Sequence, residues 1–133
     1  MTKFRFGTAI NCIDGRTQEV VIDHMKQKYD IDGVDLVTFP GVDRILSNNN
    51  KEEEQRSEEI ATLVRESVSI SVEKHGSRVI AIVGHHDCAG NPGNREHHYI
   101  HIRSAMRKMS SWNFPTQIVG FYVNDKREIE EVK

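Results

Sequence analysis

The segment VGHHDCAG, residues 83–90, holds two histidines and one of the chain's two cysteines within four consecutive positions. The other cysteine, Cys12, opens the pentapeptide CIDGR. Thiolate and imidazole groups are preferred zinc ligands, and three protein ligands leave a fourth position open, as in catalytic zinc sites. The alternative is a pair of buried structural thiols, because a free cysteine often packs as a small apolar residue.

Asp14 and Arg16 add opposite charges directly after Cys12. An arginine can hold a carboxylate in a bidentate pair, which keeps the carboxylate ionised and oriented. Asp14 would then be able to accept a hydrogen bond from a water molecule on a nearby metal. An ordinary ion pair that braces a turn is the alternative interpretation.

Apolar periodicity predicts the elements that position these residues. Strands are predicted over residues 3–12, 34–39, 78–83 and 116–123. One helix is predicted from an N-cap at Thr17 to about Tyr29, and another around residues 99–109. A capping box at Asn50 and Glu53 predicts a helix that ends at Gly76. Its apolar stripe, expected to face a sheet, comprises Ile60, Leu63, Val64, Val68 and Val72. The tail, residues 124–133, is expected to return as an edge strand or to fray.

This alternation of strands and helices predicts one α/β domain over residues 1–133. Its sheet would be mostly parallel, with four and possibly five strands and helices on both faces. Ligands of such sheets bind beyond the carboxyl ends of the strands. Cys12 follows the first predicted strand, and residues 85–88 follow the third. If these strands are neighbours, both cysteines and at least one histidine meet in one crevice, where we expect Zn²⁺ to bind.

Composition excludes several other classes of function. The formal net charge of the 133 residues is −2, so no basic excess favours a nucleic-acid partner. No apolar run approaches the roughly 18 residues of a membrane span, and the first residues do not resemble a secretory signal. We therefore expect a cytoplasmic protein, in which the two thiols stay reduced.

The two motifs resemble those of the β-class carbonic anhydrases, which carry C-x-D-x-R after the first strand and G-H-x-x-C-G after the third. The resemblance implies that Cys12, His85 and Cys88 bind zinc and that Asp14 and Arg16 form the catalytic dyad. It also implies reversible hydration of carbon dioxide to bicarbonate, by a homodimer or higher homo-oligomer. In some members the aspartate itself ligates the zinc.

The chain would be a short, divergent member of that family. TFPGV at residues 38–42 replaces the usual Arg-Asn-Ala-Gly-like loop, although Gly41 is kept. Ala89 stands where the family has glycine, with Gly90 one residue later. Two alternatives therefore stay open: a non-catalytic zinc-binding or sensing relative, and a zinc hydrolase of carbonyl sulfide or carbon disulfide.

Other candidate residues are expected to be structural. His97 and His101 are four residues apart on a predicted helix, and a solvated helix face is favoured over a second metal pair. His86 is expected to be exposed. Core packing is expected for Phe39, Val42, Trp112 and Phe114.

Overall fold

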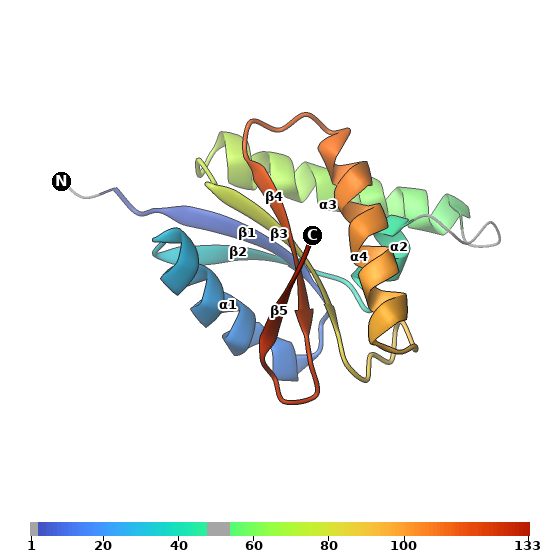
Figure 1. Ribbon diagram of the computed structural model, residues 1–133. Coiled ribbons are helices and arrows are strands. Elements are labelled where there is room, and N and C mark those ends of the chain that lie inside the picture. Colours follow the sequence, from blue (N-terminus) through green and yellow to red (C-terminus); the bar gives the residue numbers. More distant parts are fainter. Residues whose placement is uncertain (1–2, 48–53) are drawn as a thin grey trace.

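The computed structural model describes residues 3–47 and 54–133 (Figure 1). The strands are β1 (Phe6–Asn11), β2 (Gly33–Thr38), β3 (Val79–His85), β4 (Gln117–Val123) and β5 (Ile129–Val132). The helices are α1 (Gly15–Tyr29), α2 (Val42–Ser47), α3 (Glu54–Glu73) and α4 (Arg95–Ser110).

All five strands form one sheet in the order β2-β1-β3-β4-β5. The first four are parallel, and β5 pairs antiparallel with β4. Figure 1 shows α1 on one face of the sheet and α2, α3 and α4 on the other. This confirms the predicted α/β class, and the tail forms an edge strand.

Two apolar clusters hold the helices to the sheet. On one face, Val21 and Met25 of α1 pack on β-strand residues such as Phe121. On the other face, Val64 and Val68 of α3 join Ile102 of α4 in a second cluster. β3 is buried along its whole length because helices cover both of its faces.

Three details of the helices differ from the sequence predictions. Asp14, not Thr17, caps α1, because the Asp14 carboxylate accepts the Arg16 backbone N–H while Thr17 is buried within the first turn. Leu63 was predicted to belong to the apolar stripe of α3 that faces the sheet, but it is 52% exposed. The short helix α2 was not expected at all.

The predicted capping box at Asn50 and Glu53 lies outside the described residues. Trp112 and Phe114 pack against the apolar core as expected, and so do Phe39 and Val42. Within the part of the chain that the structure describes, no helix is long and apolar enough to cross a membrane.

The order of the strands places the two motifs at one edge of the sheet. β1 and β3 are adjacent and parallel, with Thr8 opposite Ile80 and Ile10 opposite Ile82. Connections from this pair run outward in opposite directions, to β2 on one side and β4 on the other. Sheets of this kind bind ligands at such a point, beyond the carboxyl ends of the strands.

Candidate metal centre

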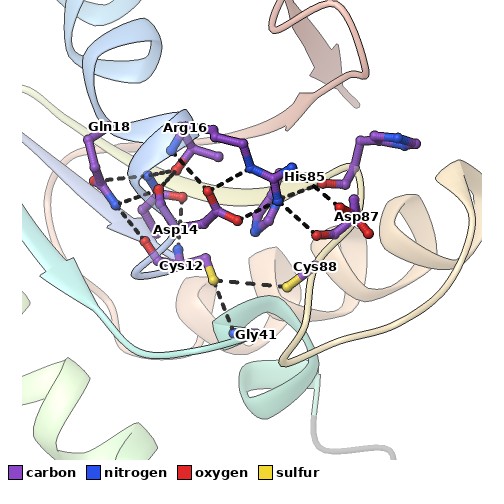
Figure 2. A network of polar contacts seen from close by, with 11 residues as sticks. Cys12, Asp14, Arg16, Gln18, Gly41, His85, Asp87 and Cys88 are labelled. Atoms are coloured by element: carbon purple, nitrogen blue, oxygen red, sulfur yellow. Dashed lines mark hydrogen bonds and ion pairs between the residues drawn. The ribbon is translucent and has the colours of Figure 1, made fainter.

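Three potential metal ligands converge beyond the ends of β1 and β3 (Figure 2). Cys12 directly follows β1, His85 is the last residue of β3, and Cys88 lies three residues further on. Their ligand atoms all lie within 4.8 Å of one another, and all three residues are buried. The sequence prediction that both cysteines and one histidine share a crevice agrees with this arrangement.

The spacing of these atoms fits a tetrahedral ion. The two Sγ atoms are 3.9 Å apart. Two sulfurs at 2.3 Å from a tetrahedral zinc would be separated by about 3.8 Å. The donor set of two sulfurs and one nitrogen therefore needs little rearrangement to accept zinc.

His85 is oriented so that one ring nitrogen stays available. Its Nδ1 lies 2.8 Å from the backbone carbonyl oxygen of His86, which can only accept, so Nδ1 carries the proton. Its Nε2 is buried without a hydrogen-bond partner among the described residues. Proteins usually orient a metal-binding imidazole by a hydrogen bond from its other ring nitrogen, as His85 Nδ1 makes here. The His86 side chain is exposed, as predicted.

The contact between the two sulfurs shifts the pKa values of the two thiols in opposite directions. The hydrogen bond from Cys88 lowers the pKa of Cys12 to about 4, and the backbone N–H groups of Gly41 and Asp14 act in the same direction. The pKa of Cys88 is raised, because Cys88 lies beside the Cys12 thiolate and is buried. A cation placed between the sulfurs would remove this repulsion and allow both to ionise.

Arg16 holds Asp14 in a bidentate ion pair. Its Nε lies 3.0 Å from Oδ1 and its Nη2 lies 2.7 Å from Oδ2 of Asp14. These bonds hold the pKa of Asp14 well below its usual range, so the carboxyl group is ionised at neutral pH.

Asp87 also binds Arg16, a contact that the sequence did not indicate. Arg16 Nη2 donates to the Asp87 backbone carbonyl at 3.1 Å, and Nη1 lies 3.3 Å from the Asp87 carboxylate. Asp87 has a φ of 56°, in the left-handed region that aspartate tolerates better than most residues. Arg16 thus links the loop after β1 to the loop after β3.

A close contact between two glycines joins the loop after β2 to the loop after β3. A Cβ atom added to Gly41 would lie 2.4 Å from the carbonyl carbon of Gly90. A Cβ atom added to Gly90 would lie 2.6 Å from the Gly41 nitrogen. The Gly41 nitrogen lies 3.5 Å from the Cys12 sulfur and its N–H donates to that sulfur. The divergent TFPGV loop therefore still supplies a hydrogen-bond donor to the site.

A cavity of about 280 Å³ opens beside His85. Val123 is the apolar side chain in its wall, and the remaining lining residues are Arg16, Thr17, His85, His86, Asn124, Asp125 and Arg127. Phe39 and Val42 do not line this cavity, because Val42 is buried in the core and Phe39 packs against that core.

The prediction of a solvated face for His97 and His101 is wrong. His101 is 8% exposed, and His97 is partly buried. Both rings contact the side chain of Asn91, at 3.0 Å and 2.7 Å. The face is buried because α4 packs against α2, a helix that the sequence pattern did not indicate.

Comparison with known proteins agrees with the motifs. A family model described as "Putative carbonic anhydrase" matches residues 2–133. Among solved structures, the β-carbonic anhydrase CafA of the fungal pathogen Aspergillus fumigatus is similar, with a TM-score of 0.49 and 13% identity over 98% of this chain and 76% of that chain. One of two tetrameric β-carbonic anhydrases from the filamentous ascomycete Sordaria macrospora gives a TM-score of 0.50 and 15% identity, over 98% of this chain and 82% of that chain. No curated protein sequence matches.

Proposed function

The chain belongs to the carbonic anhydrase family whose model it matches, and we propose that it catalyses the reversible hydration of carbon dioxide to bicarbonate with one bound zinc ion. The observation that carries this proposal is the convergence of Cys12, His85 and Cys88 beside the ion pair of Asp14 and Arg16. Both the family match and the geometry of these five side chains support this chemistry.

We assign the metal to Cys12, His85 and Cys88. The buried sulfurs and the unpartnered His85 Nε2 form a soft donor set of the type that zinc prefers. Three ligands leave one coordination position open for a water molecule. A zinc ion supplies Lewis acidity there and so makes water a nucleophile near neutral pH.

Asp14 then acts on the attacking water. Its carboxylate is ionised and fixed by Arg16, so it can accept a hydrogen bond from the water and orient a lone pair toward carbon dioxide. Two thiolates would neutralise the formal charge of Zn²⁺, so a bound zinc ion would acidify water less here than beside three neutral imidazoles. An oriented carboxylate is therefore important to this site.

Arg16 keeps Asp14 away from the open coordination position. The guanidinium is bound on two sides, to Asp14 and to Asp87, which limits the rotation of the carboxylate toward the ligands. Arg16 also lines the cavity beside His85, where its charge would favour the bicarbonate anion.

We further propose that the protein acts as a cytoplasmic homodimer or higher homo-oligomer. β2 lies at an edge of the sheet, and its Leu36 is 40% exposed. Exposed sheet edges are commonly covered by a second chain. The similar enzymes of Sordaria macrospora are described as tetrameric. A cytoplasmic location would keep both free cysteines reduced and able to bind metal.

The proposal is tested by stopped-flow carbon dioxide hydration with zinc-loaded protein. Wild-type protein should contain about one zinc per chain and be active, whereas Cys12→Ser and Cys88→Ser should each lose the metal. Asp14→Asn should keep its zinc and lose about 10²–10⁴-fold in rate, the usual contribution of a general base. Fully zinc-loaded wild-type protein that shows no hydration up to pH 9 would refute catalysis and favour a non-catalytic zinc-binding role.

A further inference from the structure

A buried hydrogen-bond network involves the loop that carries Cys88 and the two helices α2 and α4. It joins Asp43 of α2, Asn91 of the loop after β3, and three histidines of α4, which are His97, His98 and His101. Asp43 and Asn91 are each 1% exposed, and His98 is fully buried. Each hydrogen bond of such a buried network is costly to lose, so a network of this size constrains the surrounding backbone.

Asp43 is the acceptor at the centre of the network. Its Oδ2 lies 2.7 Å from His98 Nδ1, and its Oδ1 accepts from the Asn91 side chain at 3.0 Å. The backbone N–H of Arg44 also donates to Oδ1 at 3.0 Å. Three donors thus compensate the burial of one carboxylate, and removal of any of them leaves it less well satisfied.

The Asn91 side chain uses both of its polar atoms. Its Oδ1 accepts from His97 Nε2 at 2.7 Å, and its Nδ2 donates to Asp43 and to His101 Nδ1, the latter at 3.0 Å. This arrangement fixes the orientation of the amide and therefore the backbone of the loop that carries it. The same loop carries the candidate ligand Cys88, three residues before Asn91.

A second branch of the network reaches Cys12. Asp43 lies two residues after Gly41, whose N–H is the donor to the Cys12 sulfur. Gly41 is in contact with Gly90, and the Arg44 Nε donates to the Gly90 carbonyl at 3.2 Å. The segment from Gly41 to Arg44 and the loop after β3 are thus tied together in three ways: by the contact of the two glycines, by the Arg44–Gly90 hydrogen bond, and by the Asp43–Asn91 hydrogen bond.

We propose that Asp43 and Asn91 are positioning residues of the metal centre, which fix the backbone N–H donor on the Cys12 sulfur and the loop that carries Cys88, and thereby set the metal affinity. The inference rests on the proposed function, because it takes Cys12 and Cys88 as metal ligands. Hydrogen-bond donors to a thiolate orient it and spread its charge. Loss of outer partners of this kind typically weakens metal binding about 10–100-fold.

The test measures the zinc dissociation constant by competition with a chromophoric chelator, for Asp43→Asn and Asn91→Ala. Asp43→Asn keeps the shape of the side chain but turns one accepting oxygen into a donor. Asn91→Ala removes the amide and leaves Asp43 with one donor fewer. Each variant should bind about one zinc per chain, with a dissociation constant raised about 10–100-fold. The cobalt(II)-substituted variants should also show a shifted thiolate charge-transfer band.

Ser71→Ala is the matched control. Ser71 is 2% exposed and hydrogen bonds to Thr8 and Asp35, in a buried polar cluster near the amino ends of the strands. This substitution also removes a buried hydrogen bond, but far from the metal ligands. It should leave the dissociation constant and the cobalt spectrum unchanged, which separates positioning of the sulfurs from a general loss of stability.

Circular dichroism of the zinc-loaded proteins checks that each variant is folded. If Asp43→Asn does not fold, Asn91→Ala alone decides the outcome. A wild-type zinc affinity in folded Asn91→Ala would overturn the inference, even with a fully active wild-type enzyme. Weakened zinc binding in the variants would support it even if the wild-type protein binds zinc and hydrates no carbon dioxide, a result that would refute only the proposed function.

Discussion

The contact between Gly41 and Gly90 allows a prediction with internal controls. Gly41 has a φ of 60°, and an added Cβ would lie 2.4 Å from the backbone of Gly90. Gly90 does not have a left-handed backbone, but a Cβ atom added to it would lie 2.6 Å from the Gly41 nitrogen. Gly76 has a φ of 67° and nothing within 4 Å of an added Cβ. Alanine at these positions therefore probes backbone strain and close contact separately.

Gly76→Ala should lower the free energy of unfolding by about 1–2 kcal/mol, the cost of a left-handed backbone for a residue with a Cβ. Gly90→Ala should lower it by about 1–3 kcal/mol, because an overpacked site must shift its backbone to admit the methyl group. Gly41→Ala carries both costs and should lose about 2–5 kcal/mol. The double variant of Gly41 and Gly90 should lose less than the sum of the single variants, because loops already separated by one methyl group accept the second more easily.

Urea unfolding of the zinc-loaded proteins measures these differences, and chelator competition measures their zinc affinity. Gly41→Ala should bind zinc more weakly than wild type, since the displaced loop withdraws an N–H from the Cys12 sulfur. Gly76→Ala should bind zinc as wild type does. If Gly41→Ala were no less stable than Gly76→Ala and bound zinc equally well, the close contact would have no energetic role and the reasoning would be wrong.

Three further predictions concern the charged pairs and the assembly. The combination of Arg16→Ala with Asp14→Asn should lose little more hydration rate than either change alone, because both disable one unit; additive losses would separate their roles. The Arg5 hydrogen bond lowers the pKa of Asp32 to about 2 from 3.8, so the stability that this pair contributes is present above pH 4 and is lost as the pH falls through 2. Urea unfolding should therefore show Asp32→Asn less stable than wild type at pH 6 and equal to it near pH 2, and an unchanged difference at pH 2 would contradict the assignment. Light scattering at micromolar concentration should give at least a dimer mass, and a monomer mass would exclude the proposed assembly.

The sequence predicted the sheet and the ligand cluster because both depend on strong local patterns. β1 and β3 are apolar runs with clear ends, and the residues that follow them must meet if the strands are neighbours. The resemblance to the G-H-x-x-C-G motif distinguished His85 from the adjacent His86. These are properties of single segments, combined with one rule about parallel sheets.

The parts that the sequence did not predict depend on pairs of distant residues. Asp43 and His98 are 55 positions apart, and no local pattern marks either as buried. The burial of His101 follows from α2, which is only six residues long and too short to show helical periodicity. Asp14 was not predicted as the helix cap, because it was interpreted as a partner of Arg16 and of a water molecule on the metal, and Thr17 was assigned as the cap.

The positions of the two sulfurs along the chain have a consequence for how the protein folds. Cys12 and Cys88 are 76 residues apart, and bringing the ends of such a segment together in an unfolded chain costs about 4 kcal/mol of loop-closure entropy. An ion held by both thiolates would therefore bind the unfolded chain weakly and could not nucleate structure, in contrast to the closely spaced ligands of a zinc finger. The pairing of β1 with β3 must form first, so the metal would bind late in folding and act mainly by slowing the separation of these two strands.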